Sequence, residues 1–316
     1  MLKISQVSKA CVISLVNMIL ITGAAGKTGR TLLRRLSEEG KTVKALVFRP
    51  EVIPQIKALG AKEVVFGDMR DREFVLNAMQ GVDTVYHICP NVHPEETMIG
   101  QIMIYAATTV GISHFVFHSV LHPQIEAMPH HWQKMRVEEN LFESGLSFTI
   151  LQPAAYMQNI LSQWDSILKT GRYFVPYSVQ SRIAMVDLED VALVVASILE
   201  DGSIHGRQSI HYGATYELVG EPAMPQNEIA SILSQHLDCA IKATSKSLED
   251  WRQEARSSGL INYRIDTLVR MFDYYEKFGF VGNTQVLSWL LNRSATNFRT
   301  FVERVEKERS AFVTLP

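Results

Sequence analysis

From Met18 onward, short runs of β-branched residues alternate with helix-length amphipathic stretches. This alternation is typical of a parallel sheet wrapped by crossover helices. We expect strands at residues 19–22, 42–48, 63–66, 84–88, 114–119 and 147–151. A helix is expected over residues 27–39, because leucines repeat on one face and Gly40 follows as a stop. The predicted fold class is therefore α/β, with a doubly wound parallel sheet.

A glycine-rich loop joins the first expected strand to the first expected helix, and it reads Gly23-Ala24-Ala25-Gly26-Lys27-Thr28-Gly29. The first glycine permits a tight turn, the second lets a pyrophosphate approach the backbone, and the third lets the helix pack closely on the sheet. Unpaired N–H groups at the helix N-terminus then attract the anion. A glycine triplet alone is also compatible with a plain strand-to-helix turn. Together with the six strands, it predicts a Rossmann-type domain that binds a nicotinamide dinucleotide.

Arg49 indicates which form of the dinucleotide is bound. It follows the second expected strand, where an NAD enzyme carries an acid for the ribose 2′-hydroxyl. A guanidinium at this place favours a 2′-phosphate, so NADP(H) is predicted over NAD(H). Lys27 either adds a second charge near that phosphate or is a solvated loop lysine. Asp68, which precedes Met69, either meets the adenine or caps a helix.

The nicotinamide end is expected beyond strands four and five, because ligands of doubly wound sheets lie at the carboxyl ends of the strands. Cys89, Pro90 and Asn91 follow the fourth strand. Pro153 and Tyr156 follow the sixth. We predict that these five residues contact the cofactor.

Lys134 is the main catalytic candidate. It shares a helical stripe with Val137 and Leu141, so it is expected to point inward, although a lysine stem can also snorkel from such a face. We expect it to act as proton donor or to anchor the ribose. Ser119, at the end of the fifth strand, either hydrogen-bonds a substrate carbonyl or caps local backbone. His130, one helical turn before Lys134, is expected to assist.

Composition limits the possible partners. The 316 residues carry a formal net charge of -2, which supplies no basic field for nucleic acid or an anionic membrane. Three well-separated cysteines form no Cys-x-x-Cys pair, so we predict neither a disulfide framework nor a metal site, and a cytoplasmic location. His87, His114 and His118 lie within strands and are expected to be structural or surface residues rather than ligands.

Three regions are expected along the chain. Residues 1–17 are predicted to be an extension; the apolar run at 11–22 is too short to span a bilayer, and cleavage of it as a signal peptide would remove the first strand. Residues 18–153 form the predicted dinucleotide-binding domain. Residues 154–316, in which helices dominate from residue 226, form a smaller, mostly helical substrate-binding region. We expect this region to pack on the open edge of the sheet and to return some elements to it.

The sequence resembles the NmrA-like branch of the atypical short-chain dehydrogenase/reductases over nearly its whole length, from Met18 to Arg304. Besides the glycine loop, the resemblance depends on these segments: 67–68 (GD), 81–86 (GVDTVY), 117–119 (FHS), 131–134 (HWQK), 148–153 (FTILQP), 185–191 (MVDLEDV), 278–283 (FGFVGN) and 298–302 (FRTFV). Where the wider superfamily has Tyr-x-x-x-Lys, this chain has His130 at the tyrosine position and keeps Lys134. Related isoflavone-reductase-like enzymes are also thought to work with a lysine and no such tyrosine.

The resemblance leaves three functions open. The leading hypothesis is an NADP(H)-dependent oxidoreductase that transfers hydride to a quinone, enone, imine or other conjugated small molecule. The second is a non-catalytic regulator that senses NADP(H) and passes its state to a protein partner. The third is a biosynthetic isomerase or cyclase on the same fold. A homodimer is compatible with each of them.

Overall fold

Seven parallel strands form the main sheet of the computed structural model, which describes residues 17–201 and 209–313. The strand order is β11-β6-β5-β4-β1-β2-β3. The bounds are β1 (Met18–Ile21), β2 (Thr42–Val47), β3 (Glu63–Phe66), β4 (Thr84–His87), β5 (His114–His118), β6 (Phe148–Pro153) and β11 (Ala214–Leu218). The predicted fold class and its six strands are confirmed. The predicted extension lies outside the described residues except for Asn17.

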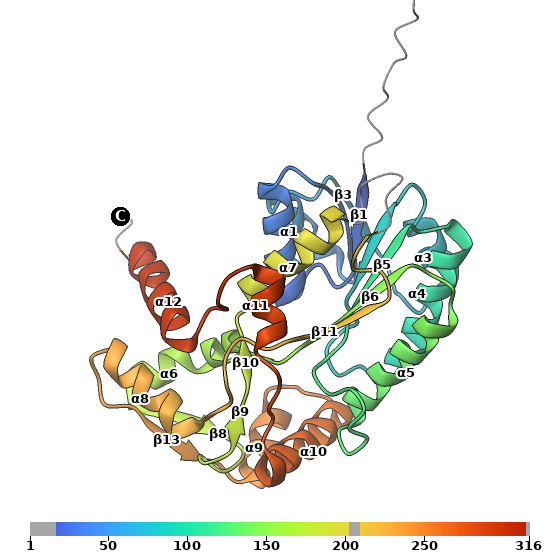
Figure 1. Cartoon of the computed structure of the whole chain (residues 1–316). Coiled ribbons are helices and arrows are strands. Elements are labelled where there is room, and N and C mark those ends of the chain that lie inside the picture. The colour runs from blue at the N-terminus through green and yellow to red at the C-terminus, as the bar shows by residue number, and fades with distance from the viewer. Residues whose placement is uncertain (1–16, 202–208, 314–316) are drawn as a thin grey trace, which may run out of the picture.

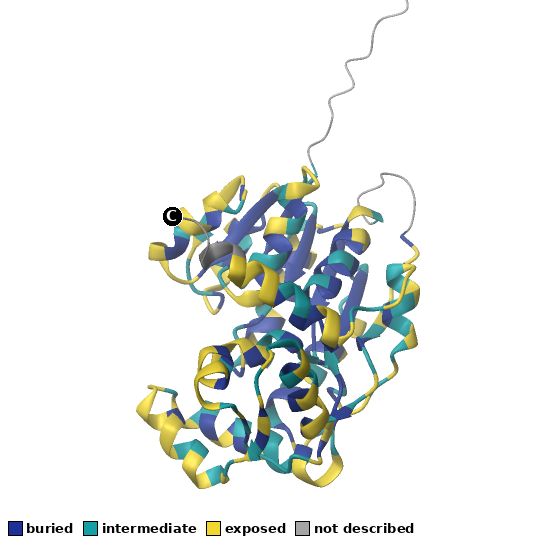
Figure 2. Cartoon of the chain, turned by 90° about the vertical axis from the view of Figure 1, so that its left-hand side faces the viewer, coloured by how far each residue is buried: buried dark blue, intermediate teal, exposed yellow. Residues whose placement is uncertain are grey.

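Helices cover both faces of this sheet (Figure 1). On one face lie α1 (Lys27–Glu38) and α7 (Leu188–Asp201), and on the other lie α3 (Arg72–Ala78), α4 (Glu96–Val110) and α5 (Pro129–Glu143). Two further short helices, η1 (Pro50–Val52) and α2 (Ile53–Ala58), connect β2 to β3. Side chains alternate along β1, so that Ile19 and Ile21 pack toward α1 while Leu20 packs toward α3 and α4. The central strands are therefore buried on both sides, as Figure 2 shows.

Part of the C-terminal region has a core of its own. The short strands are β7 (Ala155–Tyr156), β8 (Arg172–Val175), β9 (Arg182–Ile183), β10 (Met185–Val186), β12 (Met224–Pro225) and β13 (Lys242–Ser245). The helices are η2 (Met157–Gln163), α6 (Trp164–Thr170), α8 (Gln226–His236), α9 (Leu248–Ser257), α10 (Asn262–Phe278), α11 (Gln285–Leu291) and α12 (Phe298–Val313). The separate core is built around Trp164, Phe298 and Phe301, whereas Tyr275 of α10 and Leu287 of α11 pack in the core of the main sheet.

The C-terminal region meets the sheet in two ways. Its strand β11 pairs with β6 and forms an edge of the sheet. Helix α11 contacts this edge strand, whereas helices α8, α9 and α10 lie beyond the carboxyl ends of the strands (Figure 1). They therefore lie at the end of the sheet where a ligand is expected. The division at residue 153 stays a prediction.

Two buried aspartates tie the C-terminal segment to the start of α7. Asp187 Oδ2 pairs with Arg304 Nη1 at 2.8 Å, and Asp190 Oδ1 pairs with Arg293 Nη2 at 2.6 Å. Both carboxylates are almost fully buried, so each needs its guanidinium to offset the loss of hydration. These ion pairs explain why Asp187 and Asp190 occur at the N-terminus of α7, which is otherwise mostly apolar.

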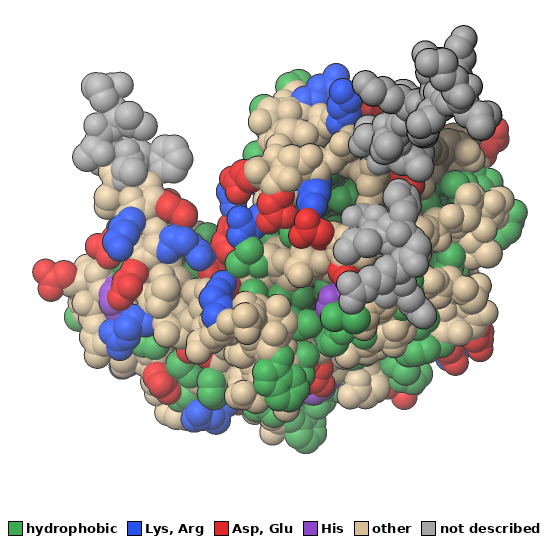
Figure 3. Space-filling model, turned by 45° about the horizontal axis from the view of Figure 1, so that its top comes forward, with side chains coloured by type: hydrophobic (Ala, Val, Ile, Leu, Met, Phe, Trp, Pro, Cys, Tyr) green, Lys and Arg blue, Asp and Glu red, His purple; other side chains and the backbone are tan. Residues whose placement is uncertain are grey.

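Surface charges of both signs are mixed on the face drawn in Figure 3. No continuous basic field is visible on that face, in keeping with the formal net charge of -2. Across residues 17–201 and 209–313, no helix is both long and apolar enough to cross a membrane. The cytoplasmic location stays a prediction.

Candidate active site

The glycine loop is shaped by close backbone approaches. Gly23 has a φ of +59°, and a Cβ on it would lie 2.9 Å from the carbonyl oxygen of Ile88 at the end of β4. A Cβ on Gly29 would lie 2.5 Å from the Gly23 oxygen and 2.6 Å from the Ala24 Cα. The loop is thus pressed against β4 at one glycine and against α1 at another, so no larger side chain fits at either place.

The N-terminus of α1 is open to an anion. Gly26 is its N-cap residue, no side chain among the described residues accepts a hydrogen bond from the first turn, and that turn contains no acid. The Lys27 ammonium donates to Asn159 Oδ1 at 3.1 Å, and burial lowers the pKa of Lys27. Positive charge and free N–H groups therefore gather where the sequence predicted a diphosphate, and these residues fit that group.

The residues predicted to bind the adenosine end occupy different environments. Arg49 is the second residue after β2 and is exposed. Asp68 is held by Arg70, whose Nη2 lies 2.6 Å from Asp68 Oδ2, and this pairing holds the pKa of Asp68 below its usual range. The helix cap is Asp71, which accepts from two backbone N–H groups of α3, so the alternative role of Asp68 as a cap is wrong. Met69 is buried in the core beneath.

Two exposed phenylalanines beside Arg49 escaped the sequence interpretation. Phe48 directly follows β2, and Phe66 ends the neighbouring strand β3, opposite Val47 in the register. Their exposed fractions are 67% and 56%. Such rings offer an apolar surface to a planar base next to the predicted phosphate-binding cation.

Thr22 brings the glycine loop and the fourth strand together. Its Oγ1 accepts from Ile88 N at 2.8 Å and lies 2.9 Å from His87 Nδ1. The strand order reverses between β1 and β4, so the following segment with Cys89, Pro90 and Asn91 faces the crevice at the switch point. Cys89 itself is buried, which raises the pKa of its thiol and keeps it protonated.

Lys134 reaches the carboxyl end of β5. Its Nζ donates to Glu96 Oε1 at 2.5 Å and to the backbone oxygen of His118 at 3.2 Å. Glu96 is 1% exposed, and this burial raises its pKa, while the Lys134 charge acts in the opposite direction. An ammonium has three N–H donors, so one is left over within the described structure. Glu96 is a site residue that the sequence analysis missed.

Ser119 hydrogen-bonds a buried side chain, whereas the sequence suggested either a substrate carbonyl or the local backbone as its partner. Its hydroxyl donates to Glu138, and Gln152 Nε2 donates to both oxygens of the same carboxylate at 3.0 Å. Ser119 is 2% exposed. Its hydrogen is therefore directed inward to a buried acid, and none remains for a substrate carbonyl.

His130 is a neutral group in this site. Burial, the adjacent His131 and Lys134 lower its pKa to about 2, and its Nδ1 is buried without a hydrogen-bond partner in the described structure. An imidazole with such a pKa is neutral at pH 7 and lacks the acidic second ring proton of an imidazolium. His130 therefore cannot serve beside Lys134 as an imidazolium acid.

His118 links two tyrosines across the site. Its Nδ1 lies 2.6 Å from the Tyr86 hydroxyl, and its Nε2 lies 2.6 Å from the Tyr156 hydroxyl. Tyr156 in turn lies 3.4 Å from Thr28 Oγ1 in the first turn of α1. The predicted cofactor residues Thr28 and Tyr156 are therefore brought together. Pro153, at the end of β6, supplies its backbone oxygen to Leu121 N.

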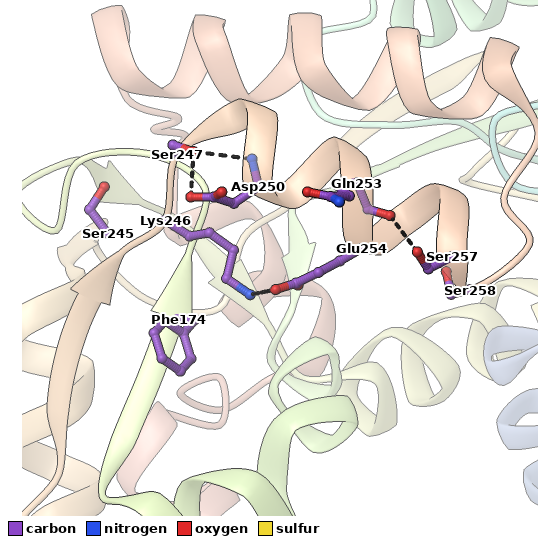
Figure 4. A pocket seen from close by; sticks show the side chains of 9 residues that line it. All are labelled: Phe174, Ser245, Lys246, Ser247, Asp250, Gln253, Glu254, Ser257 and Ser258. Atoms are coloured by element: carbon purple, nitrogen blue, oxygen red, sulfur yellow. Dashed lines mark hydrogen bonds and ion pairs between the residues drawn. The ribbon is translucent and has the colours of Figure 1, made fainter.

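A shallow pocket also lies outside this site, between β8, β13 and α9 (Figure 4). Its polar side chains pair with one another: Lys246 contacts Glu254, and Ser247 contacts Asp250. None of the predicted site residues lines it. We assign it no part in the chemistry, because its charges are already paired.

Comparison with known proteins decides the family. The model of the NmrA-like family matches residues 16–304. The chain belongs to the NmrA-like family. This confirms the resemblance drawn from the sequence motifs.

Relatives across the whole chain include enzymes and a regulator. The NAD(P)H azoreductase of Xenophilus azovorans is 26% identical over 297 residues, which cover 93% of this chain and 99% of the relative. The NADPH complex of the quinone oxidoreductase QOR2 from Escherichia coli superimposes with a TM-score of 0.77 at 24% identity, covering 91% of this chain and 99% of that one. The transcriptional regulator NmrA with NAD has a TM-score of 0.75 at 14% identity, covering 95% and 98%. At these identities the structures establish the shared fold.

Proposed function

We propose that this NmrA-like protein is an NADP(H)-dependent oxidoreductase that reduces a conjugated small molecule such as a quinone, enone, imine or azo compound. The observation that carries the proposal is the Lys134 ammonium, held inside the protein on Glu96 with one N–H left to donate. The azoreductase and the quinone oxidoreductase among the relatives support a reductase that uses a nicotinamide cofactor. The free N-terminus of α1 fits the cofactor's diphosphate.

Each part of the site has a role in this proposal. The loop from Gly23 to Gly29 would hold the diphosphate, and Arg49 would bind the 2′-phosphate. When bound, NADPH would supply the hydride. Hydride addition leaves negative charge on the substrate oxygen or nitrogen, and Lys134 Nζ would donate its remaining hydrogen to that atom. Glu96 accepts a hydrogen bond from the Lys134 nitrogen and would hold it in position.

A reductase assay with Lys134 variants tests this role. Lys134→Ala is expected to lower kcat/KM by roughly 100-fold or more, the usual contribution of a positioned proton donor. Because that change leaves the buried Glu96 carboxylate without a partner, the double variant Lys134→Met with Glu96→Gln serves as a better-folded companion. Lys242→Ala, an exposed lysine on β13, is the matched control and should keep full activity.

The assay also has an outcome that overturns the proposal. Failure of the wild-type chain to oxidise NADPH with any quinone, enone, imine or azo dye would exclude the reductase function for these substrate classes. A chain that binds NADPH without turning it over would instead fit the sensor alternative. Full activity in the Lys134→Met and Glu96→Gln double variant would remove Lys134 from the mechanism.

A further inference from the structure

The Tyr86, His118 and Tyr156 side chains form an unbroken hydrogen-bonded row from the core to the glycine loop. They come from β4, β5 and β7, and both oxygen–nitrogen distances are 2.6 Å. We propose that Tyr156 is a neutral hydrogen-bond donor to the diphosphate of the bound dinucleotide. Tyr86, acting through His118, orients the hydroxyl hydrogen of Tyr156 toward that diphosphate. This inference rests on the dinucleotide site of the proposed function.

The protonation of His118 limits the possible arrangements to two. Burial lowers the pKa of His118 to about 3, so the ring is neutral at pH 7. A neutral imidazole has one N–H donor and one acceptor nitrogen. Because a tyrosine hydroxyl lies against each nitrogen, one tyrosine must donate to the ring and the other must accept from it.

The burial of Tyr86 selects between these two arrangements. Tyr86 is 0% exposed, and among the described residues its hydroxyl has no hydrogen-bond partner except His118. If His118 donated from Nδ1, the Tyr86 hydrogen would be buried with no acceptor, which is costly. The Tyr86 hydroxyl therefore donates to Nδ1, and the hydrogen of His118 is on Nε2.

The consequence falls on Tyr156. Its oxygen accepts the hydrogen of His118 Nε2, so its own hydrogen must point in another direction. The Thr28 hydroxyl, in the first turn of α1, lies 3.4 Å away and donates at most a long hydrogen bond to the same oxygen. Within the part of the chain that the structure describes, the Tyr156 hydrogen is therefore left free at the glycine loop, beside the N-terminus that fits an anion.

The free hydroxyl serves binding rather than proton transfer. Burial raises the pKa of both Tyr156 and Tyr86 above the usual range. Passing a proton outward along the row would leave a phenolate on Tyr86, deep in the core, which is unfavourable. A fixed, neutral O–H donor to a phosphate oxygen needs no such step.

Nucleotide titrations of Tyr156→Phe test the contact. The change removes the hydroxyl and keeps the ring, so the Kd is expected to rise roughly tenfold, the typical loss for a hydrogen bond to a charged group. NADPH and NADH should weaken by the same factor, because both carry the diphosphate. Tyr173→Phe is the matched control: this buried hydroxyl bonds Gln226 in the C-terminal region, so its loss should leave both Kd values unchanged.

Coupling between the tyrosines tests the aiming role. If Tyr86 acts through His118, Tyr86→Phe should raise the Kd of both nucleotides by a smaller factor. The double variant Tyr86→Phe with Tyr156→Phe should then bind no more weakly than Tyr156→Phe alone. Independent, multiplying losses would contradict the coupling.

Ring-nitrogen NMR of the wild-type chain gives a test without any substitution. We expect His118 to show a protonated Nε2 and an unprotonated Nδ1 between pH 6 and 8. The opposite tautomer, or unchanged Kd values in a folded Tyr156→Phe variant, would overturn the inference while the proposed function stands. If the wild-type chain binds neither nucleotide, the proposed function and the inference both fail.

Discussion

Arg49 lies at the carboxyl end of β2 with its side chain exposed, and its role is tested by nucleotide selectivity. Arg49→Ala is expected to weaken NADPH binding roughly tenfold or more and to leave NADH binding unchanged, because only NADPH carries the 2′-phosphate. Isothermal titration of both nucleotides measures this. Arg136→Ala, an exposed arginine on α5, is the control for a general change in charge. Equal losses for the two nucleotides would show that Arg49 does not read the 2′-phosphate.

At the scale of single residues, the sequence predicted the positions of side chains that lie at the end of a strand or in a helical stripe. Lys134 is such a case, since its stripe runs along the buried face of α5. Glu96 was missed because an acid in the first turn of a helix is usually exposed and interacts with the helix dipole. The pairing of His118 with Tyr86 and Tyr156 was missed because its partners lie 32 and 38 residues away and only the folded sheet brings them together.

At the scale of the elements, the packing of α1 on its loop is tested by Gly29→Ala. The new Cβ would lie 2.5 Å from the Gly23 oxygen, so the helix must shift, and we expect a loss of about 2–3 kcal/mol in the free energy of unfolding. Gly40→Ala is the comparison, because Gly40 has a φ of +70° but open space around it, and about 1 kcal/mol is expected there. Urea denaturation measures both. A Gly29→Ala variant as stable as the wild type would contradict the close approach.

The elements that the sequence predicted are the long, strongly patterned ones. All six expected strands and the helix after the glycine loop are present, with boundaries that differ by at most two residues. The two-residue strands β7 and β10 were not predicted, because a pair of residues has no period to detect. Their pairing nonetheless fixes Tyr156, so an unpredictable element positions a candidate site residue.

At the scale of the whole molecule, buried histidines predict loss of stability in acid. Burial lowers the pKa of His118 and His87 to about 3, of His114 and His131 to about 4 and of His130 to about 2. Below about pH 6.5 these histidines therefore bind protons in the unfolded chain but not in the folded chain. The free energy of unfolding consequently falls as the pH decreases. Glu96, Glu138 and Glu221 act in the opposite direction, because their raised pKa values let the folded state hold protons.

The buried histidines outnumber these carboxylates, so we expect a net uptake of protons on unfolding and a lower free energy of unfolding at pH 5 than at pH 7. Urea denaturation of the full chain at pH 7, 6 and 5 measures it. Equal or greater stability at pH 5 would mean that the histidines are charged in the folded state, and the neutral His118 required for Tyr156 would then be wrong.

The central claim is that the crevice between β1 and β4 holds a nicotinamide dinucleotide on the loop from Gly23 to Gly29. A fluorescence titration of the purified chain with NADPH and with NADH tests it most directly. We expect saturable one-site binding of NADPH, with a lower Kd than for NADH. Absence of binding by either nucleotide, in a chain shown to be folded, would contradict the account.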